Sequence, residues 1–263
     1  MQVRSGDANI FYEVTGKGPD LVLLHPFPTN HHIWDPIAEQ LATRFRVILP
    51  DLRGHGNSET GEGAATMQKH ALDVLRVCDE AGVSRAVFCG NSIGGYIIFE
   101  IWRRHRERIR AMFLCGTKAG ADDAEARNNR LKAADAVERE GPAQFIETML
   151  PRVLAESTRR NRADVVDRAR SMMNEATVAG IAAVQRGMAE RPNSIPTLAT
   201  ITVPAMIAVG DEDVATPRAE AEIMARGIRG SRLLVVTGAG HYVPLEKSEE
   251  VHRLIREFAG TLA

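Results

Sequence analysis

Ser92 stands in the stretch "GNSIG" at residues 90–94, between two apolar segments. The pattern G-x-S-x-G is typical of a nucleophilic serine on a sharp turn from a strand into a helix. The backbone at such a serine is strained, and side chains two residues to either side would clash, so glycine is required at both positions. The turn exposes the hydroxyl, and the following helix directs N–H groups toward the same space. The competing interpretation is an ordinary glycine-rich turn.

A serine hydroxyl is a poor nucleophile without a base, and the base needs a carboxylate to orient it. Two later segments supply these groups in the order serine, acid, histidine. "GDEDVATP" places acids directly after an apolar run, and His241 follows the next such run in "GAGHYVPLE". Both loops should open at the carboxyl edge of a parallel sheet, where Ser92 is also expected. Together they predict acyl transfer. His25 also ends an apolar run, but it precedes the serine, and its neighbours indicate another role.

Short apolar runs alternate with longer amphipathic ones along most of the chain. The runs that read as buried strands are "DLVLLHP", "RVILPDL", "RAVFCG", "RAMFLCG", "PAMIAVG" and "SRLLVVTG", and "ANIFYEVTG" reads as a half-exposed strand. Helices are predicted over residues 66–82 with Thr66 as N-cap, after Ser92, near 218–228, and over "SEEVHRLIREF". This alternation predicts an α/β fold with a mostly parallel central sheet and helices on both faces.

Residues 118–196 break this alternation, because they contain no convincing strand and are rich in Ala, Arg and Glu. Amphipathic helices are predicted there at about 122–140, 142–149, 158–173 and 177–189. We therefore expect a core built from residues 1–117 and 197–263, with a helical cap at 118–196 inserted between two core strands. The apolar residues of such a cap would set the shape of the substrate site. A cap favours a small or medium, mainly apolar acyl substrate over a polymer.

The composition excludes several classes of protein. The 263 residues carry 33 Lys and Arg against 34 Asp and Glu, so a net charge of −1 gives no long-range attraction to nucleic acid or anionic membranes. No apolar stretch is long enough to span a membrane, and the opening residues lack the apolar centre of a secretory signal. Three cysteines, two of them in apolar runs, indicate reduced thiols in a cytoplasmic protein.

No metal or cofactor is expected from the sequence. There is no CxxC pair and no HExxH pattern. His31 and His32 are adjacent, so on a helix they would face different ways, and no third ligand is apparent. The glycines of "DLRGHGNS" do not form a phosphate-binding pattern, and the loop after "LVLLH" lacks the glycine-rich turn of a dinucleotide-binding dehydrogenase.

The chain resembles the α/β-hydrolases over nearly its whole length. The stretches that carry the resemblance, in the family's order and spacing, are "LLHPFP", "DLRGHGNS", "GNSIGG", "VGDEDVATP" and "GAGHYVPLE". The resemblance implies an α/β-hydrolase fold with Ser92 as nucleophile, Asp213 as acid and His241 as base. Asp211 is the rival acid. Asp213 is preferred because the family's acid usually stands third after the strand-ending glycine, here Gly210.

The tetrahedral intermediate of acyl transfer carries a negative oxygen, which needs an oxyanion hole. One donor should be the backbone N–H of Ile93, directly after the nucleophile. The second should come from the loop after "LVLLH", where Pro26 replaces the glycine usual in the family. Proline has no N–H, but the expected donor is Phe27, one residue later. Asn91 and Trp34 are weaker candidates for substrate binding, with packing as the alternative.

Within the family, "LRGHGNS" and the cap length resemble carboxylesterases and 3-oxoadipate enol-lactonases. The expected function is hydrolysis of a small-molecule ester or lactone through an acyl-enzyme. The alternatives are a cofactor-free haloperoxidase-like perhydrolase, a carbon–carbon bond hydrolase, and a non-catalytic ligand-binding protein on the same fold. Haloalkane dehalogenases use an aspartate nucleophile, and Ser92 argues against that class.

Overall fold

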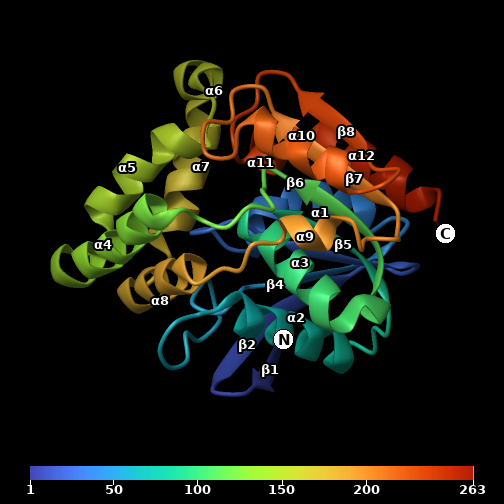
Figure 1. The fold of residues 1–263 in the computed structure, drawn as a ribbon, viewed down its shortest axis with the longest axis horizontal. Coiled ribbons are helices and arrows are strands. Elements are labelled where there is room, and N and C mark those ends of the chain that lie inside the picture. The colour runs from blue at the N-terminus through green and yellow to red at the C-terminus, as the bar shows by residue number, and fades with distance from the viewer. Residues whose placement is uncertain (263) are drawn as a thin grey trace.

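An eight-stranded sheet forms the centre of the molecule, in a computed structural model that describes residues 1–262 (Figure 1). Its strands are β1 (Gln2–Ser5), β2 (Ala8–Thr15), β3 (Asp20–Leu24), β4 (Arg46–Pro50), β5 (Ala86–Asn91), β6 (Ile109–Cys115), β7 (Ala205–Gly210) and β8 (Arg232–Val236). Their order in the sheet is β1-β2-β4-β3-β5-β6-β7-β8. β1 and β2 pair antiparallel with their neighbours, and all the other pairs are parallel. The predicted mostly parallel sheet is confirmed.

The inner strands of the sheet are buried on both faces, and β3 shows how the sequence achieves this. Val22 and Leu24 pack in one hydrophobic cluster, while Leu21 and Leu23 pack in another on the opposite face. Consecutive side chains of a strand point to opposite faces, so a strand covered on both sides must be apolar throughout. This is why the buried strands appear in the sequence as continuous apolar runs. β8, which was predicted as a buried strand, lies at the edge of the sheet and stays partly exposed.

Helices cover the two faces of the sheet, as predicted. The first cluster contains residues of α2 (Met67–Glu80), α3 (Ile93–His105) and α10 (Arg218–Gly227), and the second contains residues of α1 (Asp35–Leu41) and α12 (Ser248–Gly260). Short helical turns complete the chain at η1 (His31–Trp34), η2 (Arg106–Arg108), α9 (Ile195–Leu198) and α11 (Val243–Glu246). The Thr66 side chain accepts a hydrogen bond from the backbone N–H of Lys69 and caps α2, as the sequence predicted.

Five of the six helices between β6 and β7 gather at one side of the sheet (Figure 1). They are α4 (Ala124–Glu140), α5 (Ala143–Val153), α6 (Glu156–Asn161), α7 (Ala163–Asn174) and α8 (Val178–Ala189). Two boundaries differ from the sequence prediction. The helix predicted at 158–173 is divided at Arg162, whose backbone leaves the helical region. α5 continues through Pro151 to Val153, because a proline in the last turn removes only one helical hydrogen bond. The division into core and cap at residues 118 and 196 stays a prediction.

No helix in residues 1–262 is long and apolar enough to cross a membrane.

Candidate active site

Ser92 lies at the junction between β5 and α3, with φ 56° and ψ −114°. It is the only non-glycine residue with a positive φ in the described chain. A Cβ atom placed on Gly90 would lie 2.4 Å from the carbonyl carbon of Gly94, and one on Gly94 would lie 2.7 Å from the carbonyl oxygen of Leu24. Both glycines are therefore required, because the turn packs tightly against itself and against β3.

His241 and Asp213 meet beside this turn. The Nδ1 atom of His241 lies 3.0 Å from Oδ2 of Asp213, and both side chains are buried. Asp213 also accepts the backbone N–H groups of Ala215 and Thr216 and the Thr216 hydroxyl, at 2.8–2.9 Å. Burial alone would raise the pKa of the Asp213 carboxyl, but the charge of His241 and these hydrogen bonds outweigh burial and lower that pKa. The carboxylate is thus held ionised against the imidazole.

Asp211, the rival acid, is placed differently. Its Oδ1 accepts the backbone N–H of Gly238 at 2.7 Å, and the side chain is exposed. It makes no hydrogen bond to His241 in residues 1–262. The two aspartates follow the same strand, but the turn after Gly210 directs only Asp213 toward His241.

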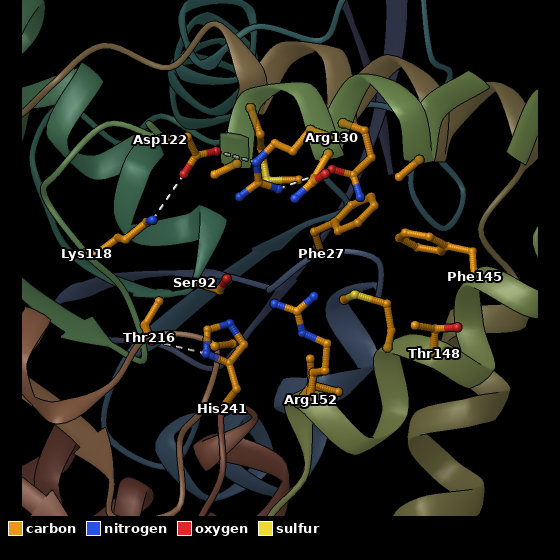
Figure 2. A pocket seen from close by; sticks show the side chains of 18 of the residues that line it. Phe27, Ser92, Lys118, Asp122, Arg130, Phe145, Thr148, Arg152, Thr216 and His241 are labelled. Atoms are coloured by element: carbon orange, nitrogen blue, oxygen red, sulfur yellow. Dashed lines mark hydrogen bonds and ion pairs between the residues drawn. The ribbon is translucent and has the colours of Figure 1, made fainter. Parts of the chain in front are cut away.

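Ser92 and His241 both line a cavity of about 390 Å³, between the sheet and the helices of residues 118–196 (Figure 2). The apolar side chains in its wall are Phe27, Tyr96, Ala126, Ala133, Phe145, Met149, Val153, Met188 and Ala215. Four charged residues also line it, namely Lys118, Asp122, Arg130 and Arg152. The apolar residues expected in the wall are therefore accompanied by charged ones. Charged and apolar positions alternate on helices, and only packing shows which of them face inward.

The two expected oxyanion donors are free. The backbone N–H groups of Phe27 and Ile93 donate to no other group in residues 1–262. Ile93 is the first residue of α3, where the N–H has no partner within the helix. The Tyr242 hydroxyl donates to the Phe27 carbonyl oxygen at 2.8 Å and fixes the loop from the side of His241. Nothing in the amino-acid sequence predicts this contact.

His25 holds the other side of the same loop. Its Nδ1 lies 2.9 Å from the carbonyl oxygen of Pro26, and its Nε2 lies 2.9 Å from the backbone N–H of Leu52. With a proton on Nδ1, the neutral ring donates to one group and accepts from the other. His25 thus joins the loop after β3 to the loop after β4, which is the separate role that the sequence indicated.

Asn91 and Trp34, the two weaker candidates for substrate binding, do not line the cavity, so the structure lends that prediction no support. Asn91 is buried, and its amide donates to the backbone carbonyls of Cys115 and His241 at 3.1 Å. Its two N–H groups are both satisfied by buried carbonyls, and one of these bonds holds the loop of His241 in place. Trp34 is fully buried in the second hydrophobic cluster, where its large apolar surface is removed from water.

The end of α5 is attached to the loop that carries His241. The carbonyl oxygen of Val153 accepts the backbone N–H groups of His241 and Tyr242, both at 3.0 Å. Glu246 accepts the N–H groups of Ala155 and Gly240, at 2.8 and 2.9 Å. Burial raises the pKa of the Glu246 carboxyl despite these bonds. The only sequence signal for this junction was an acid in the otherwise apolar stretch "HYVPLE".

The adjacent histidines His31 and His32 each hydrogen-bond to a carboxylate. The Nδ1 of His31 lies 2.7 Å from Asp51, and that of His32 lies 3.0 Å from Asp35. In the part of the chain that the structure describes, no group of three or more His, Cys, Asp or Glu side chains is arranged to hold a metal ion.

His25 and two other histidines, His55 and His70, are buried behind the loop of Phe27. The rings of His25 and His55 lie 5.0 Å apart, and His55 packs edge-on against Phe27. Neither ring nitrogen of His70 has a hydrogen-bond partner in residues 1–262. Burial penalises the charged form, so it lowers the pKa of His25 to about 3 and that of His55 to about 4, and holds the pKa of His70 well below its ordinary value.

We expect the free energy of unfolding to fall as the pH drops from 6.5 toward 4. These histidines take up protons near pH 6.5 in the unfolded chain but stay neutral in the folded one, so acid favours unfolding. Each histidine contributes about 1.4 kcal/mol per pH unit to this fall, and the three together contribute about 4 kcal/mol per pH unit. Urea unfolding at pH 6.5, 5.5 and 4.5 measures the slope. His70→Leu should reduce it by about 1.4 kcal/mol per pH unit, whereas replacing the exposed His32 by Gln should not. A stability that stays constant from pH 6.5 to 4.5 would contradict the prediction.

Comparisons with known proteins place the chain among hydrolases. Residues 19–248 match the family model described as the alpha/beta hydrolase fold. A thermophilic esterase from Thermogutta terrifontis, solved with malate bound, is 38% identical, with a TM-score of 0.97 over 100% of this chain and 99% of that chain. An enol-lactonase from Burkholderia xenovorans is 26% identical, with a TM-score of 0.92 over 99% of this chain and 100% of that chain. The 3-oxoadipate enol-lactonase 1 of Acinetobacter baylyi is 25% identical over 94% of this chain and 90% of its own length.

Proposed function

The chain belongs to the α/β-hydrolase fold family, and we propose that it is a serine hydrolase that cleaves small or medium carboxylic esters or lactones. The observation that carries the proposal is the shared cavity of Ser92 and His241, with Asp213 bonded to the far nitrogen of the imidazole. The similarity to an esterase and to enol-lactonases, which confirms the resemblance predicted from sequence, supports ester-bond hydrolysis as the reaction.

In the proposed reaction, Ser92 attacks the ester carbonyl while Nε2 of His241 takes its proton. Asp213 binds Nδ1 of the same ring at 3.0 Å, so it holds the tautomer that leaves Nε2 free to accept. The carboxylate also stabilises the imidazolium that forms, because the pKa of Asp213 is lowered and the group remains charged. His241 then returns the proton to the departing alcohol, and the acyl group stays on Ser92.

The negative oxygen of the tetrahedral intermediate would be bound by the N–H groups of Phe27 and Ile93. Both donors are free before substrate arrives, so binding the oxyanion breaks no hydrogen bond within the protein. Ile93 adds the positive end of the α3 dipole. In the second half of the reaction, His241 takes a proton from water as the water oxygen attacks the acyl carbonyl. The bond between the acyl group and Ser92 then breaks, His241 returns the proton to the Ser92 oxygen, and the acid is released.

The proposal is tested by release of p-nitrophenol from esters of increasing acyl length, together with labelling by a fluorophosphonate. We expect turnover of short esters, a decline for long chains because the cavity measures about 390 Å³, and one covalent adduct per chain on Ser92. A lactone series followed by pH-stat separates lactonase from esterase activity. If folded protein releases no acid from either series and takes no label, the serine hydrolase is excluded and a ligand-binding role on this fold replaces it.

A further inference from the structure

The cavity wall carries more positive than negative charge, although the whole chain has a net charge of −1. Lys118, Arg130 and Arg152 line it, against the single carboxylate of Asp122. Asp122 lies 3.1 Å from Lys118, forms an ion pair with Arg130, and also binds the buried Arg191 at 3.0 Å. One carboxylate is therefore shared by three cations, and Arg152 is not among them.

Arg152 is the cation without a partner. Its guanidinium makes no hydrogen bond or ion pair with any group in residues 1–262, whereas Lys118 and Arg130 are bound to Asp122. Figure 2 shows the guanidinium of Arg152 pointing into the cavity, between His241 and the rings of Phe27 and Phe145. A guanidinium is always charged and offers five N–H donors, so this one is available to an anionic group of a ligand.

Arg152 is exposed to solvent at the cavity, and its backbone lies next to a contact with the loop of His241. Arg152 lies in the last turn of α5, directly before Val153. The Val153 carbonyl accepts the backbone N–H groups of His241 and Tyr242. Arg152 therefore stands one residue before the backbone contact between α5 and the proposed base, His241. An anion bound by Arg152 would lie in the same cavity as Ser92 and His241.

We infer that Arg152 binds a carboxylate of the substrate, and that the protein prefers esters or lactones that carry a free carboxylate beyond the scissile carbonyl, such as monoesters of short dicarboxylic acids. The inference rests on the proposed function and names its substrate class. A carboxylate matches the planar donors of a single guanidinium in a two-bond arrangement. A phosphate dianion would leave further charged oxygens facing Phe27 and Phe145. The cavity of about 390 Å³ suits a small dicarboxylate derivative.

The test compares two methyl esters of equal chain length, monomethyl adipate and methyl hexanoate, by kcat/KM in a pH-stat. We expect the native protein to favour the monoester by about tenfold or more, because one charge-assisted pair distinguishes the two substrates. Arg152→Gln should lower this ratio by about tenfold. Arg152→Lys should give an intermediate ratio, because lysine keeps the positive charge but cannot donate the two parallel hydrogen bonds of a guanidinium. Arg127→Gln, an exposed position of α4 outside the cavity wall, makes the same charge change and should leave the ratio unaltered.

A native ratio near one, with Ser92-dependent hydrolysis of methyl hexanoate intact, would overturn the inference and leave the proposed function standing. A ratio that is equal in Arg152→Gln and native protein would also overturn it. Should neither ester be cleaved, the proposed function fails, and calorimetric titration of Ser92→Ala protein still tests the charge site. Binding of monomethyl adipate, but not of methyl hexanoate, that disappears on adding Arg152→Gln supports the carboxylate site. Inorganic phosphate that binds as tightly as monomethyl adipate overturns the carboxylate assignment.

Discussion

Replacing Ser92 by alanine is expected to lower kcat for a short p-nitrophenyl ester by about 10⁴-fold or more, because no other group can form the acyl-enzyme. The cavity, the free N–H groups of Phe27 and Ile93, and His241 all remain, so substrate binding should change little. Steady-state kinetics measures the loss in kcat, and the fluorophosphonate adduct should disappear with it. Residual activity above one per cent of native would show that Ser92 is not the nucleophile.

Ser92→Gly gives a matched variant that separates loss of the hydroxyl from loss of structure. The backbone at Ser92 has φ 56°, which glycine adopts without strain. We expect Ser92→Gly to be as inactive as Ser92→Ala, and to raise the free energy of unfolding by about 1 kcal/mol relative to it. Urea unfolding of the two variants side by side provides the measurement. Equal stability of the two would mean that the turn stores no backbone strain.

Asp213→Asn is expected to lower kcat by about 10³- to 10⁴-fold while leaving KM nearly unchanged. The asparagine amide can donate to Nδ1 of His241, which favours the tautomer with its proton on Nε2 and so blocks proton transfer from Ser92. It also removes the negative charge that stabilises the imidazolium. The pKa of the Asp213 carboxyl is lowered by His241 and Thr216 against the effect of burial, so the native carboxylate is charged throughout the neutral pH range.

Asp211→Asn is the matched control, since it makes the same chemical change two residues earlier. Its side chain contacts the N–H of Gly238, and not His241. We expect kcat to stay within about twofold of the native value, because an exposed side chain outside the site is replaced by one of the same shape. A large loss in Asp211→Asn with a small one in Asp213→Asn, from the same kinetic assay, would reverse the assignment of the acid.

Features that depend on neighbouring residues could be predicted from the sequence. The strand before Ser92, the turn and the helix after it follow from an apolar run, two glycines and a second apolar run within fifteen residues. The cap at Thr66 and the buried strands follow in the same way, because hydrogen bonding and burial at these places act over a few residues. The helix boundary at Arg162 was missed, because the helical periodicity continues across it.

The sequence was less informative about which side chains line the same cavity. Asn91 and Trp34 were expected near the substrate, yet both are buried elsewhere. Asn91 stands next to Ser92 in the chain, but its amide is drawn to carbonyls of Cys115 and His241 on the interior side of the sheet. Adjacent residues in a strand or turn point in different directions, so closeness in sequence to a reactive group does not place a residue in its cavity.

Local patterns were enough to infer the fold class, the strained serine turn, and an acid and a histidine at the ends of two later strands. Packing of the whole chain selects which acid reaches His241, holds the loop of Phe27, and brings Arg152 to the cavity without a partner. The difference lies in the distance along the chain over which the interactions act. Sterics and periodic burial act between residues close in the chain, whereas Tyr242 and Phe27 are 215 positions apart and meet only because the packed sheet brings its strand ends together.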